Sequence, residues 1–314
     1  MSDAVYIVTP CYNMVKTIDE TIWSILSQAG KEFSLRYHVQ DGGSSDGTLE
    51  KLRAWEKRCL DNPDFLPNCV FTYASEPDNG MYDAIARGIA RLDIPETAFM
   101  GWLNGDDTLW SGALAAIARL AIQIPEVDWV MGWPCWLDEC GRFTHIDRSL
   151  VYPQSILASG LADGLHWQFI QQESTFWRKR IWNAVGGIDA TLKNAGDWDL
   201  WYRFAQKTPL VHMQRQLGAF RVRPGQKSSD LSKYRQEMEK ILPITIRQKN
   251  FNKILKDKKN LQSVLVAWQD QDGIWRQDIR RNSGKYQKFV RKLFCRFPKL
   301  GLKLKIIREL LLKR

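Results

Sequence analysis

The sequence predicts an α/β protein built on a largely parallel β-sheet. Between residues 4 and 103, short apolar β-rich runs alternate with amphipathic runs of helical spacing, and a polar loop follows each apolar run. This repeated strand–loop–helix order is typical of parallel sheets covered by helices. The 314 residues are 44% hydrophobic and 25% charged, which excludes a disordered chain, a collagen and a disulfide-rich miniprotein.

The first two elements are predicted from short, clear patterns. Residues 4–9 form an apolar run closed by Pro10, as expected for a buried strand that ends in a loop. Residues 17–28 follow with apolar side chains at helical spacing, and Thr17 and Glu20 stand in capping-box register. A strand followed at once by a helix therefore opens the chain.

The remaining elements repeat that order. The expected strands are residues 34–40, 69–74 and 98–103, and the expected helices are residues 48–60, 81–92 and 197–205. A hairpin is expected around Gly141, and the segment after Asp107 is rich in Trp. We expect a main domain over residues 1–229, a helical extension over 230–279 and a basic tail over 280–314.

The six cysteines contain no C-x-x-C pair, so a structural zinc site is not expected. The N-terminus has no basic region before its short apolar run, as a signal peptide would have, and no apolar run approaches the length of a membrane span. Reduced thiols and the absence of these segments indicate a cytoplasmic protein.

The net charge of +10 comes from the tail. Residues 280–314 hold 13 Lys or Arg against one acid, Glu309, so the rest of the chain carries a net charge of −2. Apolar residues recur in the tail at helical spacing, with breaks expected at Pro298 and Gly301. A basic amphipathic segment of this kind favours an anionic membrane surface; the alternative is a helix docked on the domain with a solvated basic face. Nucleic acid is not an expected partner.

Four polar loops follow the expected strands. They are residues 9–13, 41–46, 76–82 and 104–107. Because ligands of open α/β sheets bind at the carboxyl ends of the strands, we expect these loops to build one crevice. The pair Asp106-Asp107 is compatible with a divalent cation held by carboxylate oxygens and substrate phosphates, or with a simple turn or helix cap.

The four loops resemble those of inverting glycosyltransferases of family 2, which have the GT-A fold, a mixed Rossmann-like sheet flanked by helices. The matching segments are Thr9-Pro10-Cys11-Tyr12-Asn13, Asp41-Gly42-Gly43-Ser44-Ser45-Asp46-Gly47-Thr48, Glu76-Pro77-Asp78-Asn79-Gly80-Met81-Tyr82-Asp83-Ala84 and Leu103-Asn104-Gly105-Asp106-Asp107. The third is similar to bacterial polysaccharide members of the family. The resemblance continues through residues 172–178, 186–189 and 197–201 and covers about residues 4–228.

The resemblance implies a role for each matched residue. The residues expected to contact the nucleotide sugar are Thr9, Pro10, Tyr12, Asn13, Asp41, Asp78, Asp83, Arg87 and Asp106. Asp41 would accept the N3–H of uracil between Thr9 and Tyr12, and Asp107 would hold Mn²⁺ or Mg²⁺ at the diphosphate.

The same resemblance implies Asp197 as the general base that deprotonates the acceptor hydroxyl, with Asp199 as the runner-up. On a helix, Asp197 and Trp201 would share one face. Trp198 and Trp201 are therefore candidate acceptor contacts, although one of them is expected in the core, the commoner position of helical Trp.

Two positions depart from the family pattern. Ala86 replaces an Asn that many members carry, and Arg223 stands where relatives often have His, sometimes a metal ligand. Arginine does not ligate cations, so Asp107 is left as the main protein ligand unless His212 substitutes. Alternatively, Arg223 and Lys227 contact the diphosphate directly, which would weaken metal dependence.

The resemblance implies a metal-dependent enzyme that moves one sugar from a nucleotide donor, UDP-linked by preference, to a glycan or lipid-linked acceptor. Bacterial surface polysaccharide synthesis, lipopolysaccharide included, at the inner face of the cell membrane is the implied setting. Missing transmembrane helices and a missing Q-x-x-R-W motif argue against a processive synthase. A nucleotidyltransferase or a dinucleotide oxidoreductase would need a Gly-rich loop where this chain has Pro10 to Asn13. An inactive scaffold of the same fold is the alternative.

Overall fold

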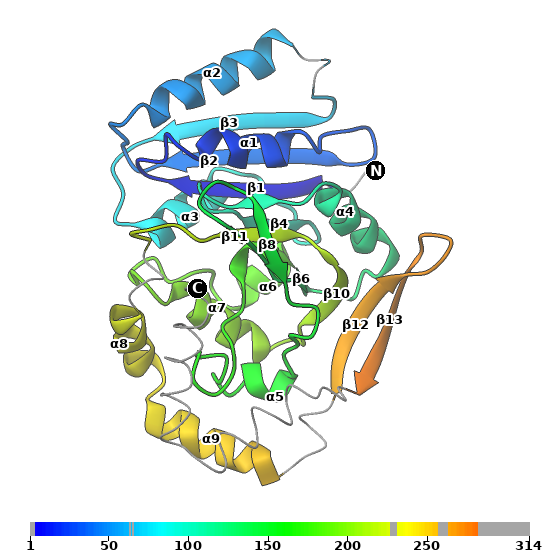
Figure 1. Cartoon of the computed structure of the whole chain (residues 1–314). Coiled ribbons are helices and arrows are strands. Elements are labelled where there is room, and N and C mark those ends of the chain that lie inside the picture. Colours follow the sequence, from blue (N-terminus) through cyan, green and yellow to red (C-terminus); the bar gives the residue numbers. More distant parts are fainter. Residues whose placement is uncertain (1–3, 63, 65, 227–230, 257–262, 282–314) are drawn as a thin grey trace. The chain divides into compact units, whose positions relative to one another are not determined.

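The computed structural model describes residues 4–62, 64, 66–226, 231–256 and 263–281 (Figure 1). Contacts group the chain into one unit through Arg280 and a second unit from Arg281. The first unit carries all the structure described below. The expected basic tail, with its two helices, lies outside the described residues apart from its first two positions.

A nine-stranded sheet organises the described part of the chain, in the order β13-β12-β10-β6-β9-β4-β1-β2-β3. Its strands are β1 (Ala4–Cys11), β2 (Ser34–Asp41), β3 (Cys69–Ser75), β4 (Phe99–Trp102), β6 (Trp129–Trp133), β9 (Thr175–Arg178), β10 (Val211–Gln216), β12 (Ser263–Gln269) and β13 (Trp275–Arg281). β1 pairs in parallel with β2 and β4, whereas β9 runs antiparallel to β4 and β6. The predicted mixed α/β sheet is confirmed.

Helices cover both faces of this sheet. They are α1 (Ile18–Leu26), α2 (Thr48–Asp61), α3 (Met81–Ala90), α4 (Ala113–Gln123), α5 (Gln154–Leu157), α6 (Lys179–Ala184) and α7 (Gly196–Ala205). Alternate residues of β1 enter different cores, because successive strand side chains point to opposite faces. Val5 and Ile7 pack with α1 and α4, and Tyr6 and Val8 pack with α3 and α7.

A second sheet follows the Asp106-Asp107 turn. It has four strands within the described residues, in the order β5 (Thr108–Leu109), β11 (Gly218–Arg221), β7 (Cys135–Leu137) and β8 (Phe143–Ile146). β7 and β8 form the hairpin predicted around Gly141. The short 3-10 helix η2 (Gln172–Ser174) packs against β11 and leads into β9.

The C-terminal extension is only partly helical. Helices α8 (Ser232–Ile241) and α9 (Ile244–Lys256) agree with the prediction, but residues 263–281 form the strands β12 and β13. A helix was expected there, and that expectation is wrong. β12 pairs in parallel with β10 and buries Val264, Val266 and Ala267, so the extension completes the main sheet.

The contacts of α8 and α9 place them beside the Trp-rich part of the chain: α8 contacts α7, and α9 contacts α5 (Figure 1). Among the described helices, none has the length and apolar character needed to cross a bilayer.

Candidate active site

The loops after β1 and β2 are joined by reciprocal hydrogen bonds. Asn13 adopts a positive φ of 53°, its N–H donates to Ser44 Oγ (2.7 Å), and its Oδ1 accepts from Ser45 N (3.0 Å). Val15 N donates to Asp46 Oδ2 at 3.0 Å. These bonds hold the first two polar loops against each other at the carboxyl ends of their strands, as expected for a ligand crevice.

The two residues predicted to flank uracil, Thr9 and Tyr12, lie in different environments. Tyr12 is 58% exposed and offers an open aromatic ring, but Thr9 is fully buried, with its hydroxyl 2.9 Å from Tyr37 Oη. Pro10 is buried as well. Thr9 and Pro10 therefore pack in the core, and their contact with the nucleotide remains a prediction.

Asp41 organises the second loop from a fully buried position. Its Oδ2 accepts from Gly43 N, Ser44 N and Ser75 Oγ at 3.1, 2.9 and 2.6 Å, and its Oδ1 accepts from Ser44 Oγ at 2.5 Å. A base N3–H would have to replace one of these donors. Asp41 thus holds the second loop in place, and its direct contact with the base remains a prediction.

The third loop brings Asp78 and Asp83 to the same edge. Asp78 Oδ1 accepts from Gly80 N (2.7 Å), and a Cβ on Gly42 would lie 2.6 Å from Asp78 Oδ2, so the second and third loops are in contact. Asp83 accepts from Asn79 N (2.8 Å) and pairs with Arg87 (2.8 Å). The Asn79 N–H, more than Arg87, lowers the pKa of Asp83.

Asp106 and Asp107 lie at the end of the fourth loop. Thr17 and Thr21 of the first helical region donate to the carbonyls of Gly105 (2.7 Å) and Asp107 (2.8 Å). The Asp107 carboxylate is fully buried and accepts from Arg221 N (2.9 Å) and Asn104 Nδ2 (3.2 Å). Burial, then the neighbouring charges of Asp106 and Glu173, raises the pKa of Asp107 well above its usual range.

Arg223 reaches this motif, and its direct contact with the diphosphate remains a prediction. Its Nε donates to Asp106 Oδ2 at 2.6 Å, and its guanidinium also lies 3.8 Å from Met14 Sδ of the first loop. A permanent cation therefore stands at the acidic motif. Lys227 lies outside the described residues.

His212 does not substitute as a metal ligand. Its Nε2 accepts from Tyr152 N (2.9 Å), its Nδ1 donates to the carbonyl of Leu265 (3.1 Å), and burial lowers its pKa to about 4. Both ring nitrogens are used inside the main sheet, so that expectation is wrong.

The carboxylate oxygens of the fourth loop are ligands of the kind that a hard cation prefers. Within the described residues, no group of three His, Cys, Asp or Glu side chains could hold a metal. Magnesium, however, is commonly bound through one or two carboxylates together with substrate phosphates and water. Asp106 and Asp107 supply that pair, with Arg223 in competition for Asp106.

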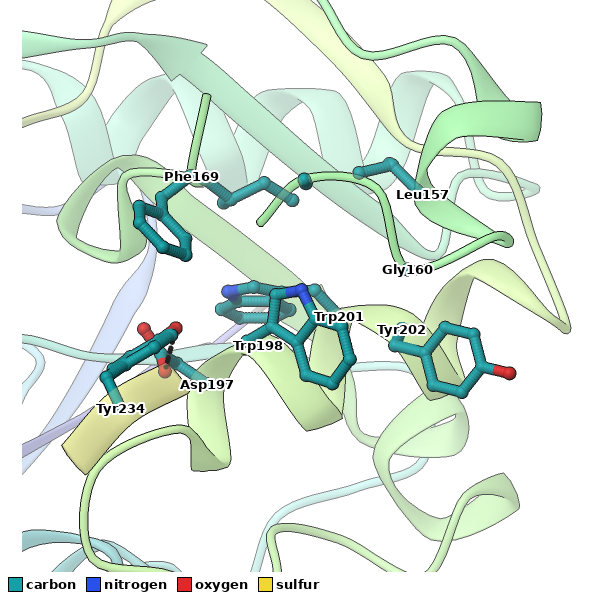
Figure 2. Close-up of a pocket in the computed structure, with 10 residues that line it drawn as sticks. Leu157, Gly160, Phe169, Asp197, Trp198, Trp201, Tyr202 and Tyr234 are labelled. Carbon is teal, nitrogen blue, oxygen red and sulfur yellow. Dashed lines mark hydrogen bonds between the residues drawn. The ribbon is translucent and has the colours of Figure 1, made fainter. Parts of the chain in front are cut away.

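Asp197 lies at the start of α7, at the wall of a pocket (Figure 2). Tyr82 Oη and Tyr234 Oη both donate to its Oδ1, each at 2.9 Å. Burial raises the pKa of Asp197, and the hydrogen bonds from Tyr234, the Trp198 backbone and Tyr82 oppose this rise. A carboxylate of raised pKa, anchored through one oxygen, is suited to accept a proton.

The two candidate tryptophans differ. Trp201 is stacked between Trp102 and Trp129, with ring centroids 5.7 Å away on each side, so neither face of its ring is open to a sugar. Trp201 lies in the core, as expected for one of the two tryptophans; because it also lines the pocket, its contact with the acceptor remains a prediction. Trp198 stacks on Tyr202 (5.8 Å) and lines the pocket (Figure 2).

The runner-up base, Asp199, is paired with Arg203 of the same helix at 2.6 Å, in an arrangement that holds α7 together. A third acid was given no role from the sequence. Glu173 of η2 is buried, and its Oε1 has no hydrogen-bond partner. Burial, then the charge of Asp197, raises the pKa of Glu173 to about 8.

Sequence reasoning also missed Tyr82, Tyr234 and Glu237. Tyr82 stands inside a matched motif, which was the available signal. Tyr234 and Glu237 lie on α8, in a polar helix beyond the resemblance, and nothing local in that helix indicates a contact with Asp197.

Comparison with protein families gives a match to the model described as "Glycosyl transferase family 2" over residues 6–187. The chain belongs to this family. No curated protein matches the sequence.

Solved structures show the same fold at low identity. S. aureus TarS 1–349, in complex with UDP-GlcNAc, has a TM-score of 0.53 and 16% identity, over 72% of this chain and 60% of that one. The mannosyltransferase PcManGT from Pyrobaculum calidifontis, with GDP-Man and Mn²⁺, has 0.50 and 18%, over 72% and 59%. GalNAc-T7, with UDP, GalNAc and Mn²⁺, has 0.52 and 13%, over 76% and 48%. The predicted GT-A glycosyltransferase fold is confirmed, and the chain spans about half to three-fifths of these proteins.

Proposed function

We propose that this family 2 glycosyltransferase moves one sugar from a nucleotide-diphosphate sugar to an acceptor hydroxyl, with inversion at the anomeric carbon. The observation that carries the proposal is the convergence of four polar loops at one edge of the sheet, beside a carboxylate held by two tyrosines. The fold relatives crystallised with UDP-GlcNAc and with GDP-Man support a nucleotide sugar as the donor class.

The donor would lie across the loops. Tyr12 offers a ring for the base, and Asp41, Asp78 and Asp83 lie at the nucleoside end, whereas Arg223 stands at Asp106 where a diphosphate would arrive. Guanidinium groups bind phosphate oxygens in a bidentate way, so Arg223 is suited to this contact. A UDP-linked donor is favoured by the family resemblance.

Asp197 would act as the base. As the acceptor oxygen bonds to the anomeric carbon, the bond from that carbon to the diphosphate breaks, and the hydroxyl proton passes to the Asp197 carboxylate. Tyr82 and Tyr234 donate to Oδ1, so Oδ2 is the oxygen proposed to accept the proton. Burial raises the pKa of Asp197 and so strengthens it as a base.

A divalent cation at Asp106 and Asp107, when bound, would offset the negative charge that develops on the departing nucleoside diphosphate. Mn²⁺ is present in two of the fold relatives, and Mn²⁺ or Mg²⁺ is the proposed cofactor. Because Arg223 already pairs with Asp106, this chain's own cation would share that task.

The acceptor is proposed to be a glycan or lipid-linked oligosaccharide of bacterial surface polysaccharide synthesis. The basic, amphipathic sequence of residues 280–314 supports attachment to an anionic membrane surface. The second candidate, a catalytically inactive nucleotide-binding scaffold, is favoured by the ion pair between Arg223 and Asp106 at the expected metal site.

Calorimetric titration tests the donor site directly. UDP, GDP and dTDP are titrated with and without Mn²⁺ into the wild type and Asp107→Asn. We expect micromolar binding of one nucleotide, with the metal-coupled part lost in the variant. No binding of any nucleotide would contradict both the enzyme and the nucleotide-binding scaffold.

A further inference from the structure

Helix α8, which lies beyond the matched family region, reaches the carboxylate of Asp197. Tyr234 of α8 donates to Asp197 Oδ1 at 2.9 Å (Figure 2). Tyr82 of α3 contacts the same oxygen. The carbonyl oxygen of Asn194 lies 2.7 Å from Tyr82 Oη and shares its single hydroxyl proton with Asp197. Asp197 is thus held between helices that are about 150 residues apart in sequence.

A second side chain of α8 holds the backbone just before Asp197. Glu237 accepts from the N–H groups of Lys193 (2.9 Å), Asn194 (2.8 Å) and Ala195 (2.8 Å). Helix N-termini leave backbone N–H groups without helical partners, and here a carboxylate from another helix supplies acceptors next to that terminus. Asp197 follows Ala195 by two residues, so Glu237 sets the entry of the chain into α7.

Apolar packing fixes α8 in this place. Met238 is fully buried in a cluster with Ala195 and Trp198, and Tyr234 packs at its edge. Tyr234 and Glu237 are three residues apart, which places them on neighbouring positions of one helix face. One side of α8 therefore makes three contacts. Tyr234 contacts Asp197, Glu237 contacts the backbone before it, and Met238 packs in the apolar cluster next to them.

We propose that α8 is a positioning element of the active site, in which Tyr234 orients the Asp197 carboxylate and Glu237 fixes the start of α7. The inference rests on the proposed function for its catalytic meaning, because it assigns Asp197 as the base. Tyr234 and Glu237 are positioning residues, since they act through Asp197.

The polar and charged groups around Asp197 predict in which direction its pKa changes when Tyr234 is replaced. Tyr82 and Tyr234 donate to it, Glu173 of η2 lies close enough to interact with its charge, and Glu237 is nearby on α8. On α7 itself, Asp199 is neutralised by Arg203. Hydroxyl donors stabilise the charged carboxylate and lower its pKa, so removing one raises the pKa of Asp197.

Tyr234→Phe tests this without requiring sugar transfer. Carbodiimide labels protonated carboxyl groups, and the labelling of Asp197 against pH is followed by peptide mass spectrometry. We expect Tyr234→Phe to extend labelling to higher pH than the wild type. Tyr152→Phe is the matched control, because it removes a hydroxyl that donates to the Phe169 carbonyl at 2.6 Å near the same pocket and not to Asp197.

The rate of nucleotide-sugar hydrolysis measures the effect on catalysis. For Tyr234→Phe we expect the acidic limb of the kcat profile to move to higher pH and kcat on that limb to fall about tenfold, with the donor KM changed less than about twofold. Glu237→Ala should lower kcat similarly, and Glu237→Gln, which keeps an acceptor oxygen, should lose less.

The outcomes separate the two claims. Labelling profiles of Tyr234→Phe that match those of the wild type and Tyr152→Phe would overturn the role of α8. A shifted labelling profile in a protein that hydrolyses no nucleotide sugar would support the positioning and contradict the proposed function. Urea unfolding identifies any variant that fails to fold, and Glu237→Gln then replaces Glu237→Ala.

Discussion

Replacing Arg221 should loosen the loop that carries Asp106 and Asp107 and so weaken nucleotide binding. Its side chain is 1% exposed, its Nε donates to the Asp106 carbonyl at 2.7 Å, and its guanidinium pairs with Glu20 of α1. Arg221→Met keeps an unbranched apolar stem in place of the arginine stem and removes these contacts. The backbone N–H of residue 221 still donates to Asp107, so the variant tests the guanidinium alone.

The expected cost follows from these contacts. A hydrogen bond from a charged donor contributes about 1.5–3 kcal/mol. The ion pair with Glu20 adds at most about 1 kcal/mol, because Glu20 is 56% exposed and regains water. We therefore expect the free energy of unfolding to fall by about 2–4 kcal/mol, and nucleotide affinity to fall about tenfold as the Asp106 loop loosens.

Urea unfolding and calorimetric titration with the preferred nucleotide measure the two effects. Arg203→Met is the control, because Arg203 also donates to two carbonyls, of Val185 and Gly187, and pairs with an acid, but lies away from the fourth loop. It should lose stability and keep nucleotide affinity. If Arg221→Met loses stability but binds nucleotide like Arg203→Met, the reasoning about the loop is refuted.

Other predictions concern charge. Arg223→Ala should weaken nucleotide binding in EDTA more than in Mn²⁺, as titration in the two conditions would show; unchanged binding in both conditions would contradict a contact between Arg223 and the diphosphate. Because Glu173 has a folded pKa of about 8 against a usual value near 4.5, its proton is lost later in the folded state, so it lowers stability as pH rises through this interval. Glu173→Gln should therefore lose less stability than the wild type between about pH 5 and pH 8 in urea unfolding, and parallel profiles would contradict this. Deleting residues 284–314 should release the protein from anionic vesicles in a flotation assay, and equal retention would favour a docked helix.

Much of the main sheet could be predicted because its signals are local. The apolar run of β1 and the helical spacing of α1 need no distant contact to be recognised, and both lie within two residues of their expected ends. The loops after these strands also share one edge by topology alone. The position of Asp78 at that edge was predictable for the same reason, whereas Arg223 follows β11 of the second sheet and was singled out by the family resemblance.

The parts that could not be predicted depend on long-range contacts. β12 and β13 read as a continuation of a polar helical region, and β12 is stabilised as a strand by pairing with β10, more than 50 residues earlier. Thr9 stands in a matched motif yet turns inward to Tyr37. Tyr234 meets Asp197 because Met238 and Glu237 hold α8 in place through contacts that no local pattern reveals.

The central claim is that Asp197 is the base of a sugar-transfer reaction. The most direct test measures nucleotide release from a panel of UDP-, GDP- and dTDP-sugars by the wild type and Asp197→Asn, with nucleotide affinity determined in parallel. We predict that the wild type releases nucleotide from one donor, and that the variant loses this release while binding the nucleotide with nearly unchanged affinity. Equal release by both proteins would contradict the assignment of Asp197.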